Sequence, residues 1–155
     1  MYTTRKPRVA IFDMDGTLTD VSGIRHYVEN GQGEKNFTAF HKASLFCPPH
    51  EWVLKLLLQL DERAVIVTGR DERFRDVTQD WLFKHKTHGR TVGLFMRPWG
   101  DLRKDYEVKR EILVQKILPY YEPIFAVDDN PNVLALWREF DIPTVTVPGW
   151  EDGPK

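Results

Sequence analysis

The stretch over residues 8–18 constrains this chain more than any other, because a buried strand runs directly into two acids. Residues 9–12 are almost entirely apolar, a pattern typical of a strand buried on both faces of a parallel sheet. Asp13 and Asp15 follow, and Gly16 indicates that the chain turns there. Carboxylates at the end of a buried strand are costly unless a cation or hydrogen-bond donors meet them. The stretch therefore predicts a ligand site at the sheet edge, where open α/β sheets place their ligands.

Strands alternate with helices along the rest of the chain. Further buried strands are predicted at 64–68, 92–96, 124–127 and 144–147, and apolar spacing predicts helices after Pro48-Pro49 and over 71–86, 105–118 and 130–140. We therefore expect a single α/β domain over residues 1–155, a three-layer α/β/α sandwich around a parallel, Rossmann-like sheet.

Two further expectations concern the segment after the first strand and the tryptophans of the helices. The polar segment 19–48 is expected to form only a flap or small cap, with a short helix over 36–46 that turns Phe37 and Phe40 inward. On the predicted helices, Trp52, Trp81 and Trp137 fall on apolar faces and are expected to be core residues.

The composition fits a soluble globular domain and limits its partners. Of 155 residues, 41% are hydrophobic and the formal net charge is −1, so phosphate neutralisation alone is not expected to hold long nucleic acids. Cys47 is the one cysteine, and buried packing is favoured over a catalytic thiol there. The chain has no apolar signal region and no run long enough to span a bilayer. We expect a cytoplasmic protein without a membrane partner.

Polar residues follow the carboxyl ends of the four clearest strands. They are Asp13 and Asp15, Thr68-Gly69-Arg70, Arg97, and Asp128 with Asp129. A parallel sheet brings these ends to one edge, so we expect one chemical site there. The gathered carboxylates would repel one another without a divalent cation, and their oxygens favour Mg²⁺. The five histidines show no metal-ligand spacing and are expected to be structural or exposed.

The motifs and their order resemble those of the haloacid dehalogenase (HAD)-type phosphohydrolases. Asp13-Met-Asp15-Gly-Thr-Leu resembles the first motif, Thr68 the second, Lys109 the third and Asp128-Asp129 the fourth. A closer similarity is to the phosphatase domain of phage polynucleotide kinase-phosphatases. It rests on Val-Thr-Gly-Arg70, on residues 100–109 and on residues 126–138, and it is weakest over 21–49. The phosphate-loop sequence of the kinase half of those proteins is not present.

The resemblance implies a mechanism. Asp13 would attack phosphorus and form an aspartyl-phosphate, and Asp15 would act as general acid and then as base. For that dual role the charge beside Asp15 would raise its pKa. Asp13, the backbone carbonyl of Asp15, Asp128 and Asp129 would hold Mg²⁺, and which of the last two binds directly stays open.

Further residues would meet the phosphoryl group. Thr68 and Lys109 would hold its oxygens, and Asp105, four residues before Lys109, would orient the ammonium. Gly69 and Arg70 lie at the active edge, and Arg70 could fork onto a phosphate or form a structural salt bridge.

Residues around the expected site leave several alternatives open. Arg25 resembles a flap arginine of the phage phosphatases, displaced by one residue. Arg97, Arg103 and Lys104 could form a path for a nucleic-acid backbone or be ordinary exposed charges. Trp99 could stack a terminal base or pack in its turn.

These observations predict a Mg²⁺-dependent phosphomonoesterase. The resemblance implies that its substrate is a 3′-phosphate at a DNA or RNA end, or a nucleoside 3′-phosphate, with a separate kinase or ligase as a possible partner. The alternatives are a small-molecule phosphatase such as a nucleotidase, a phosphoacceptor signalling module and a catalytically silent end-binding protein.

Overall fold

A parallel sheet forms the centre of the molecule. The computed structural model describes residues 5–29 and 35–149. Within them, five strands pair in the order β3-β2-β1-β4-β5. Their bounds are Arg8–Phe12 (β1), Arg63–Asp71 (β2), Thr91–Arg97 (β3), Glu122–Asp128 (β4) and Thr144–Thr146 (β5). All neighbouring pairs are parallel, as predicted.

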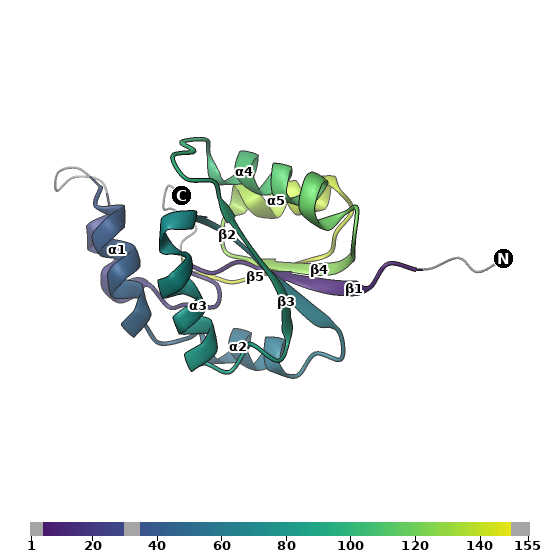
Figure 1. The fold of residues 1–155 in the computed structure, drawn as a ribbon, viewed down its shortest axis with the longest axis horizontal. Coiled ribbons are helices and arrows are strands. Elements are labelled where there is room, and N and C mark those ends of the chain that lie inside the picture. Colours follow the sequence, from purple (N-terminus) through teal and green to yellow (C-terminus); the bar gives the residue numbers. More distant parts are fainter. Residues whose placement is uncertain (1–4, 30–34, 150–155) are drawn as a thin grey trace.

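Helices cover both faces of the sheet. They are α2 (Glu51–Leu58), α3 (Arg75–Lys84), α4 (Asp105–Ile112) and α5 (Pro131–Glu139), while a fifth helix, α1 (Phe37–Ala43), belongs to the segment after β1. Helix α4 continues as a π-helical turn, η4 (Leu113–Ile117). Figure 1 shows α4 and α5 on one side of the sheet and α2 and α3 on the other, which confirms the three-layer α/β/α sandwich. Among the described residues, no helix combines the length and apolarity that crossing a bilayer requires.

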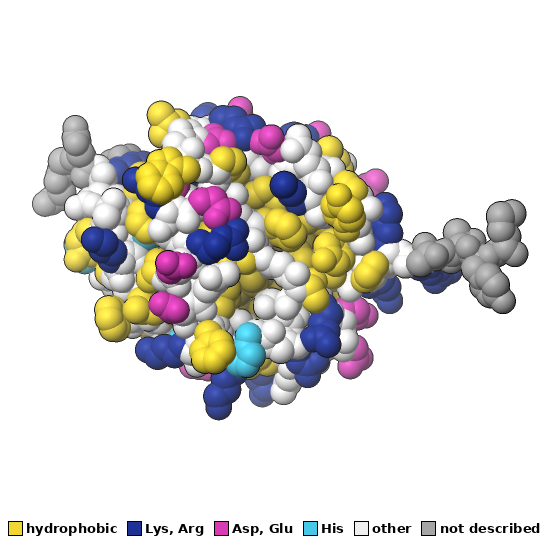
Figure 2. Space-filling model, in the orientation of Figure 1, with side chains coloured by type: hydrophobic (Ala, Val, Ile, Leu, Met, Phe, Trp, Pro, Cys, Tyr) yellow, Lys and Arg dark blue, Asp and Glu magenta, His cyan; other side chains and the backbone are white. Residues whose placement is uncertain are grey.

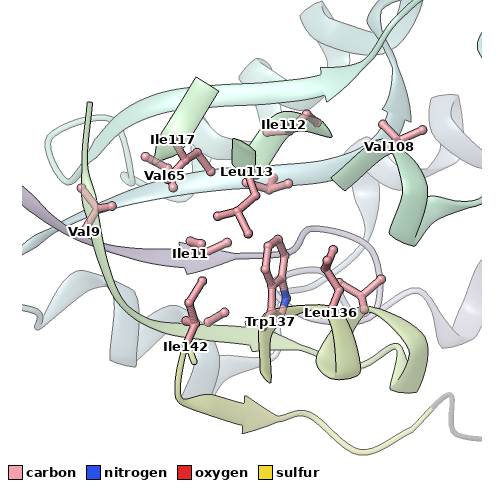
Figure 3. Packing of buried hydrophobic residues seen from close by; sticks show 13 residues of the cluster. Val9, Ile11, Val65, Val108, Ile112, Leu113, Ile117, Leu136, Trp137 and Ile142 are labelled. Carbon is pink, nitrogen blue, oxygen red and sulfur yellow. The ribbon is translucent and has the colours of Figure 1, made fainter. Parts of the chain in front are cut away.

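Strand β1 is buried on both faces because its side chains alternate between two cores. Val9 and Ile11 join the cluster beneath α4 and α5, where Ile112 and Trp137 pack (Figure 3). Ala10 and Phe12 face the other cluster, built with α2 and α3. The acids that follow β1 are therefore anchored by the most deeply packed strand of the sheet.

The segment between β1 and α2 is the one expected to form a flap or small cap, and we call it the flap. It contains η1 (Ser22–Tyr27), α1 and η2 (Ser44–Phe46), and its own cluster joins Val21, Val28 and Phe40. Phe40 is buried on α1, as predicted, but the prediction for Phe37 was wrong, since this residue is 50% exposed and His41 is buried beside Phe40. Figure 1 shows α1 beside the sheet rather than on either face.

Trp52 also departs from its prediction. It is 47% exposed, because α2 buries the stripe formed by Val53, Leu54 and Leu57, one position further along. Trp81 and Trp137 are fully buried, as expected. On the face shown in Figure 2, basic and acidic side chains are interspersed, in keeping with the low net charge.

The carboxyl end of β2 is irregular where predicted site residues lie. The strand extends beyond the expected Thr68 to Asp71, and its register against β3 shifts between Val67 and Asp71. Residues 68–70 therefore bulge from the ladder. A bulge at a sheet edge re-aims side chains, and this one turns them into the cleft described next.

Candidate active site

A cleft of about 330 Å³ lies at the carboxyl edge of the sheet. Predicted site residues from three strand ends and α4 line it, namely Asp13, Asp15, Thr68, Gly69, Arg70, Arg97 and Asp105. The flap contributes Phe37, Phe40 and His41 to the opposite side. The structure thus brings together residues that lie far apart in the sequence.

A buried ammonium joins the acids of β1 and β4. Lys109 on α4 donates to Asp13 Oδ1 at 2.8 Å and to Asp128 Oδ2 at 3.0 Å. The side chains of all three residues are almost fully buried. The backbone N–H of Asn130, which caps α5, donates to the other oxygen of Asp128 at 3.0 Å. Two strand ends and two helices are thereby fixed to one another.

The acid cluster has the donor set of a divalent cation site. Asp13, Asp128 and Asp129 each offer an oxygen within 4.8 Å of the others. The Thr17 hydroxyl lies 3.1 Å from Asp13 Oδ2 and 3.1 Å from Asp129 Oδ1, and its one proton can serve only one of them at a time. Three carboxylates gathered in this way are the ligands that a hard cation prefers. No role is predicted for Thr17 from the sequence.

Gly16 makes the close approach of Asp129 possible. Its φ of +82° is in the left-handed region that favours glycine, and an added Cβ would lie 2.2 Å from Asp129 Oδ2. Any side chain at this position would push the Asp129 carboxylate away from the other two acids. The glycine of the first motif therefore shapes the acid cluster as well as the turn.

Arg70 binds Asp15, the second acid of the first motif. Its guanidinium forks onto the Asp15 carboxylate with N···O distances of 2.9 and 2.5 Å and donates to Thr78 Oγ1 at 2.9 Å. Burial raises the pKa of Asp15, but the charge and hydrogen bonds of Arg70 outweigh it and hold this pKa below its ordinary value. The raised pKa expected for Asp15 is therefore not found in this conformation. In this conformation Arg70 forms the structural salt bridge left open as its alternative.

His41 is a neighbour of Asp15 that the sequence analysis missed. The flap helix α1 places its Nδ1 3.9 Å from Asp15 Oδ2. Burial lowers the pKa of His41 to about 4, so the imidazole is neutral at pH 7. A lone histidine on a short helix shows no periodic pattern, and only the packing of the flap could reveal it.

Asp105 has a different partner from the one predicted. It accepts a hydrogen bond from Arg97 at 2.6 Å, whereas the Lys109 ammonium is held by the acids of β1 and β4. An added Cβ on Gly69 would lie 2.4 Å from Asp105 Oδ1, so the glycine lets this carboxylate sit against the β2 bulge. Arg97 also donates to the Gly69 carbonyl at 2.8 Å. Arg97 and Asp105 thus brace the cleft wall.

The remaining predicted residues lie at or beyond the rim of the cleft. Arg25 is not among the residues that line it, and its guanidinium lies near Gly149. Arg103 lines the cleft but pairs with Asp101 and Glu111. Lys104 lines it at the start of α4.

Two residues resolve alternatives that the sequence left open. The Trp99 ring is 73% exposed, so it is not packed in its turn. Cys47 is buried, and burial raises the pKa of its thiol, which favours packing over catalysis.

The Thr68 hydroxyl is buried and accepts a hydrogen bond from the Arg70 backbone N–H at 3.1 Å.

A parallel α/β sandwich with this acidic edge defines a phosphatase of the HAD type, and comparison with known proteins supports that class. Residues 7–149 match the family described as the polynucleotide kinase PNKP phosphatase domain. The chain belongs to this family.

Relatives are found among curated proteins and among solved structures. A predicted bifunctional polynucleotide kinase/RNA ligase of Autographa californica nuclear polyhedrosis virus is 28% identical over 142 residues, covering 90% of this chain and 19% of the viral protein. Two structures of a Pnkp1/Rnl/Hen1 complex, one described as an RNA repair complex, match with TM-scores of 0.76 and 0.72 at 28% and 27% identity. They cover 94% and 95% of this chain, which spans 47% and 45% of the matched chains.

A more distant structure shares the fold. The class C acid phosphatase from Bacillus anthracis with tungstate bound matches with a TM-score of 0.57 at 18% identity, over 81% of this chain and 53% of that enzyme. The chain thus spans about a fifth of its viral relative and about half of the matched structures.

The Arg70–Asp15 pair generates a prediction about stability. Arg70→Met should lower the free energy of unfolding by about 3–5 kcal/mol at pH 7, because it leaves a buried carboxylate without its cation. In the wild type the lowered pKa of Asp15 stabilises the fold above its ordinary pKa, and this contribution is lost as the pH falls. Without Arg70, burial would instead raise the pKa of Asp15, so the variant should bind a proton and regain stability as the pH falls from 7 toward 4. The difference between variant and wild type, measured by urea unfolding, should therefore shrink over that range.

A matched control removes an arginine from a more exposed pair. Arg75 binds Glu72 at 2.7 Å on α3, and Arg75→Met should cost less than about 1 kcal/mol. A pH-independent loss for Arg70→Met, or equal losses for the two variants, would contradict the assignment of the buried pair.

Proposed function

We propose that this phosphatase is a Mg²⁺-dependent phosphomonoesterase that acts through an aspartyl-phosphate on 3′-phosphate ends of nucleic acid. The observation that carries the proposal is that Asp13 and Asp15 face one cleft while separate cations, Lys109 and Arg70, hold their carboxylates. The two acids are thus held for different roles. We assign this activity to one phosphatase domain that contains the described residues.

Asp13 would act as the nucleophile. Its Oδ atom attacks phosphorus in line, an aspartyl-phosphate bond forms, and the ester P–O bond breaks with its electron pair on the leaving oxygen. The Lys109 ammonium, already 2.8 Å from Asp13 Oδ1, lies where it can meet the charge of the phosphoryl oxygens. The Thr68 hydroxyl, which lines the same cleft, would contact those oxygens as well.

Asp15 would move the protons. It donates one to the leaving oxygen, then accepts one from the water that hydrolyses the aspartyl-phosphate and releases inorganic phosphate. Its carboxyl must hold a proton for the first step, and the Arg70 fork opposes this. Transfer of Arg70 from Asp15 to the arriving phosphate would relieve that opposition and give Arg70 the substrate role expected from the sequence.

The cation would be held by Asp13, Asp128 and Asp129, with the Asp15 backbone carbonyl as a further ligand. When bound, Mg²⁺ would neutralise the repulsion between these acids and the phosphate. The gathering of these three carboxylates supports this assignment.

The substrate assignment is supported by the family and by the viral relative, whose name includes polynucleotide kinase and RNA ligase activities. A flap that forms only a small cap suits access by a polymer end. We infer a role in nucleic-acid end repair beside a kinase or ligase, in the cytoplasm, or in that of the host if the chain is viral.

The nucleophile assignment is tested by Asp13→Asn. The variant should fold and lose at least about 1,000-fold in kcat, because an amide oxygen cannot replace the attacking carboxylate. Phosphate release and unfolding temperature are measured together. An active, folded variant would overturn the mechanism, and one stable phosphoryl group per wild-type chain without turnover would favour a phosphoacceptor module.

The metal assignment is tested without relying on activity alone. Mg²⁺ added to EDTA-treated protein should raise the unfolding temperature, because a ligand that binds only the folded state stabilises it. At one hundred times its Kd, such a ligand raises the free energy of unfolding by about 2.7 kcal/mol. Turnover should return over the same concentration range. Asp129→Asn should weaken both responses, whereas Asp76→Asn, on α3 outside the acid cluster, should leave both unchanged. Equal activity in EDTA would refute metal dependence.

The substrate class is tested by comparing a 3′-phosphorylated oligonucleotide, a nucleoside 3′-phosphate and a sugar phosphate. We expect kcat/KM to be at least about tenfold higher for the oligonucleotide than for the sugar phosphate, because the sugar phosphate lacks a base that could stack. Equal values for all three would instead favour a small-molecule phosphatase.

A further inference from the structure

Three rings and one guanidinium, each in contact with the next, lead from Asp15 out of the cleft. The His41 ring, beside Asp15, lies 4.5 Å from the Phe74 ring. The Arg73 guanidinium lies 5.3 Å from the centroid of Phe74 and 5.3 Å from that of Trp99. These spacings are those of aromatic and cation–π contacts. We call His41, Phe74, Arg73 and Trp99 the aromatic ribbon.

The inner end of the ribbon has an unmet hydrogen bond. His41 is 7% exposed and lines the cleft. Its Nδ1 is buried without a hydrogen-bond partner among the residues that the structure describes. A buried polar atom of this kind is costly unless a bound group completes it. The position beside Asp15 places that group next to the leaving oxygen.

The outer end is a fixed, exposed platform. Asp71 accepts hydrogen bonds from the Arg73 backbone at 2.9 Å and from the Gly100 backbone at 3.2 Å, so the Trp99 turn is tied to the start of η3 (Glu72–Phe74). Gly100 has a φ of +76°, which favours glycine in this turn. Trp99 lies in the connection between β3 and α4, and Arg73 lies in η3, which follows β2.

Neighbouring charges make stacking the main source of affinity on this side of the cleft. Arg97 is paired with Asp105, and Arg103 with Asp101 and Glu111. These guanidiniums are largely neutralised, so they offer little to a phosphate backbone. Exposed ring and guanidinium faces, by contrast, accept any nucleobase.

We propose that the aromatic ribbon is the binding site of the leaving nucleic-acid strand. The terminal sugar lies against His41, which completes the hydrogen bond of Nδ1, and a base stacks on the Arg73–Trp99 platform. The proposal rests on the proposed function, since it takes Asp15 as the group that protonates the leaving oxygen. It assigns the ribbon to recognition of a strand of any sequence.

The outer end is tested with Trp99→Ala, using a 3′-phosphorylated oligonucleotide and an aryl phosphate. The ratio of their kcat/KM values should fall about tenfold, the scale of one lost base–aromatic stack. Trp52→Ala removes another exposed tryptophan, on α2 outside the cleft, and should leave the ratio unchanged. An unchanged ratio in Trp99→Ala would overturn the platform.

The inner end is tested with two His41 variants on the same substrates. His41→Phe should lower the ratio at least about tenfold, whereas His41→Asn, whose amide can replace Nδ1, should retain most of it. His85→Phe, at a histidine that packs against Trp81 away from the cleft, is the control. Equal losses on both substrates, or no rescue by asparagine, would overturn the role of His41.

These outcomes are distinguishable from failure of the proposed function. If wild-type protein releases no phosphate, or Asp13→Asn stays active, the phosphatase mechanism itself is wrong. If the wild type turns over both substrates and Asp13→Asn does not, a constant substrate ratio in the ribbon variants counts against the ribbon alone.

Discussion

The Lys109 ammonium between Asp13 and Asp128 is the interaction on which the rest of the site depends. Removing three charges from water is costly, and only close, well-directed hydrogen bonds offset that cost. Val108 and Ile112 pack α4 against the sheet and carry the ammonium into its buried position. The packing of one helix therefore fixes the spacing of acids from two different strands. The same spacing brings Asp13, Asp128 and Asp129 close enough that they could hold one metal ion.

The fold and the meeting of strand ends could be predicted because both follow from local rules. Short apolar runs that alternate with helical stripes specify a parallel sheet, and a parallel sheet gathers its carboxyl ends at one edge. Errors arose where a local pattern had to predict a distant partner. The spacing of Asp105 and Lys109 is favourable along a helix, but Asp105 binds Arg97 and Lys109 binds the acids of β1 and β4. Trp52 lies one position outside the buried stripe of its helix, a difference that its sequence spacing does not reveal.

His41 and Thr17 could not have been assigned from the sequence for a different reason. The flap has little periodicity of its own, so no pattern indicates which of its side chains faces the sheet edge. The approach of Thr17 to Asp129 depends on a glycine and on a strand more than one hundred residues away. Arg70 was located correctly at the active edge, but its partner in this conformation depends on how the β2 bulge turns it toward Asp15.

The separate cluster of the flap has a consequence for how such proteins diversify. Val21, Val28 and Phe40 pack with one another rather than within the two cores that flank the sheet. Substitutions within this small cluster would therefore disturb the two cores little, whereas the end of the flap is tied to the scaffold by Leu45 and by the Cys47 carbonyl, which accepts a hydrogen bond from Trp81. Selection could retune ligand preference in the insert while the chemistry stays constant. The architecture thus separates two evolutionary pressures that more uniformly packed enzymes must satisfy at the same positions.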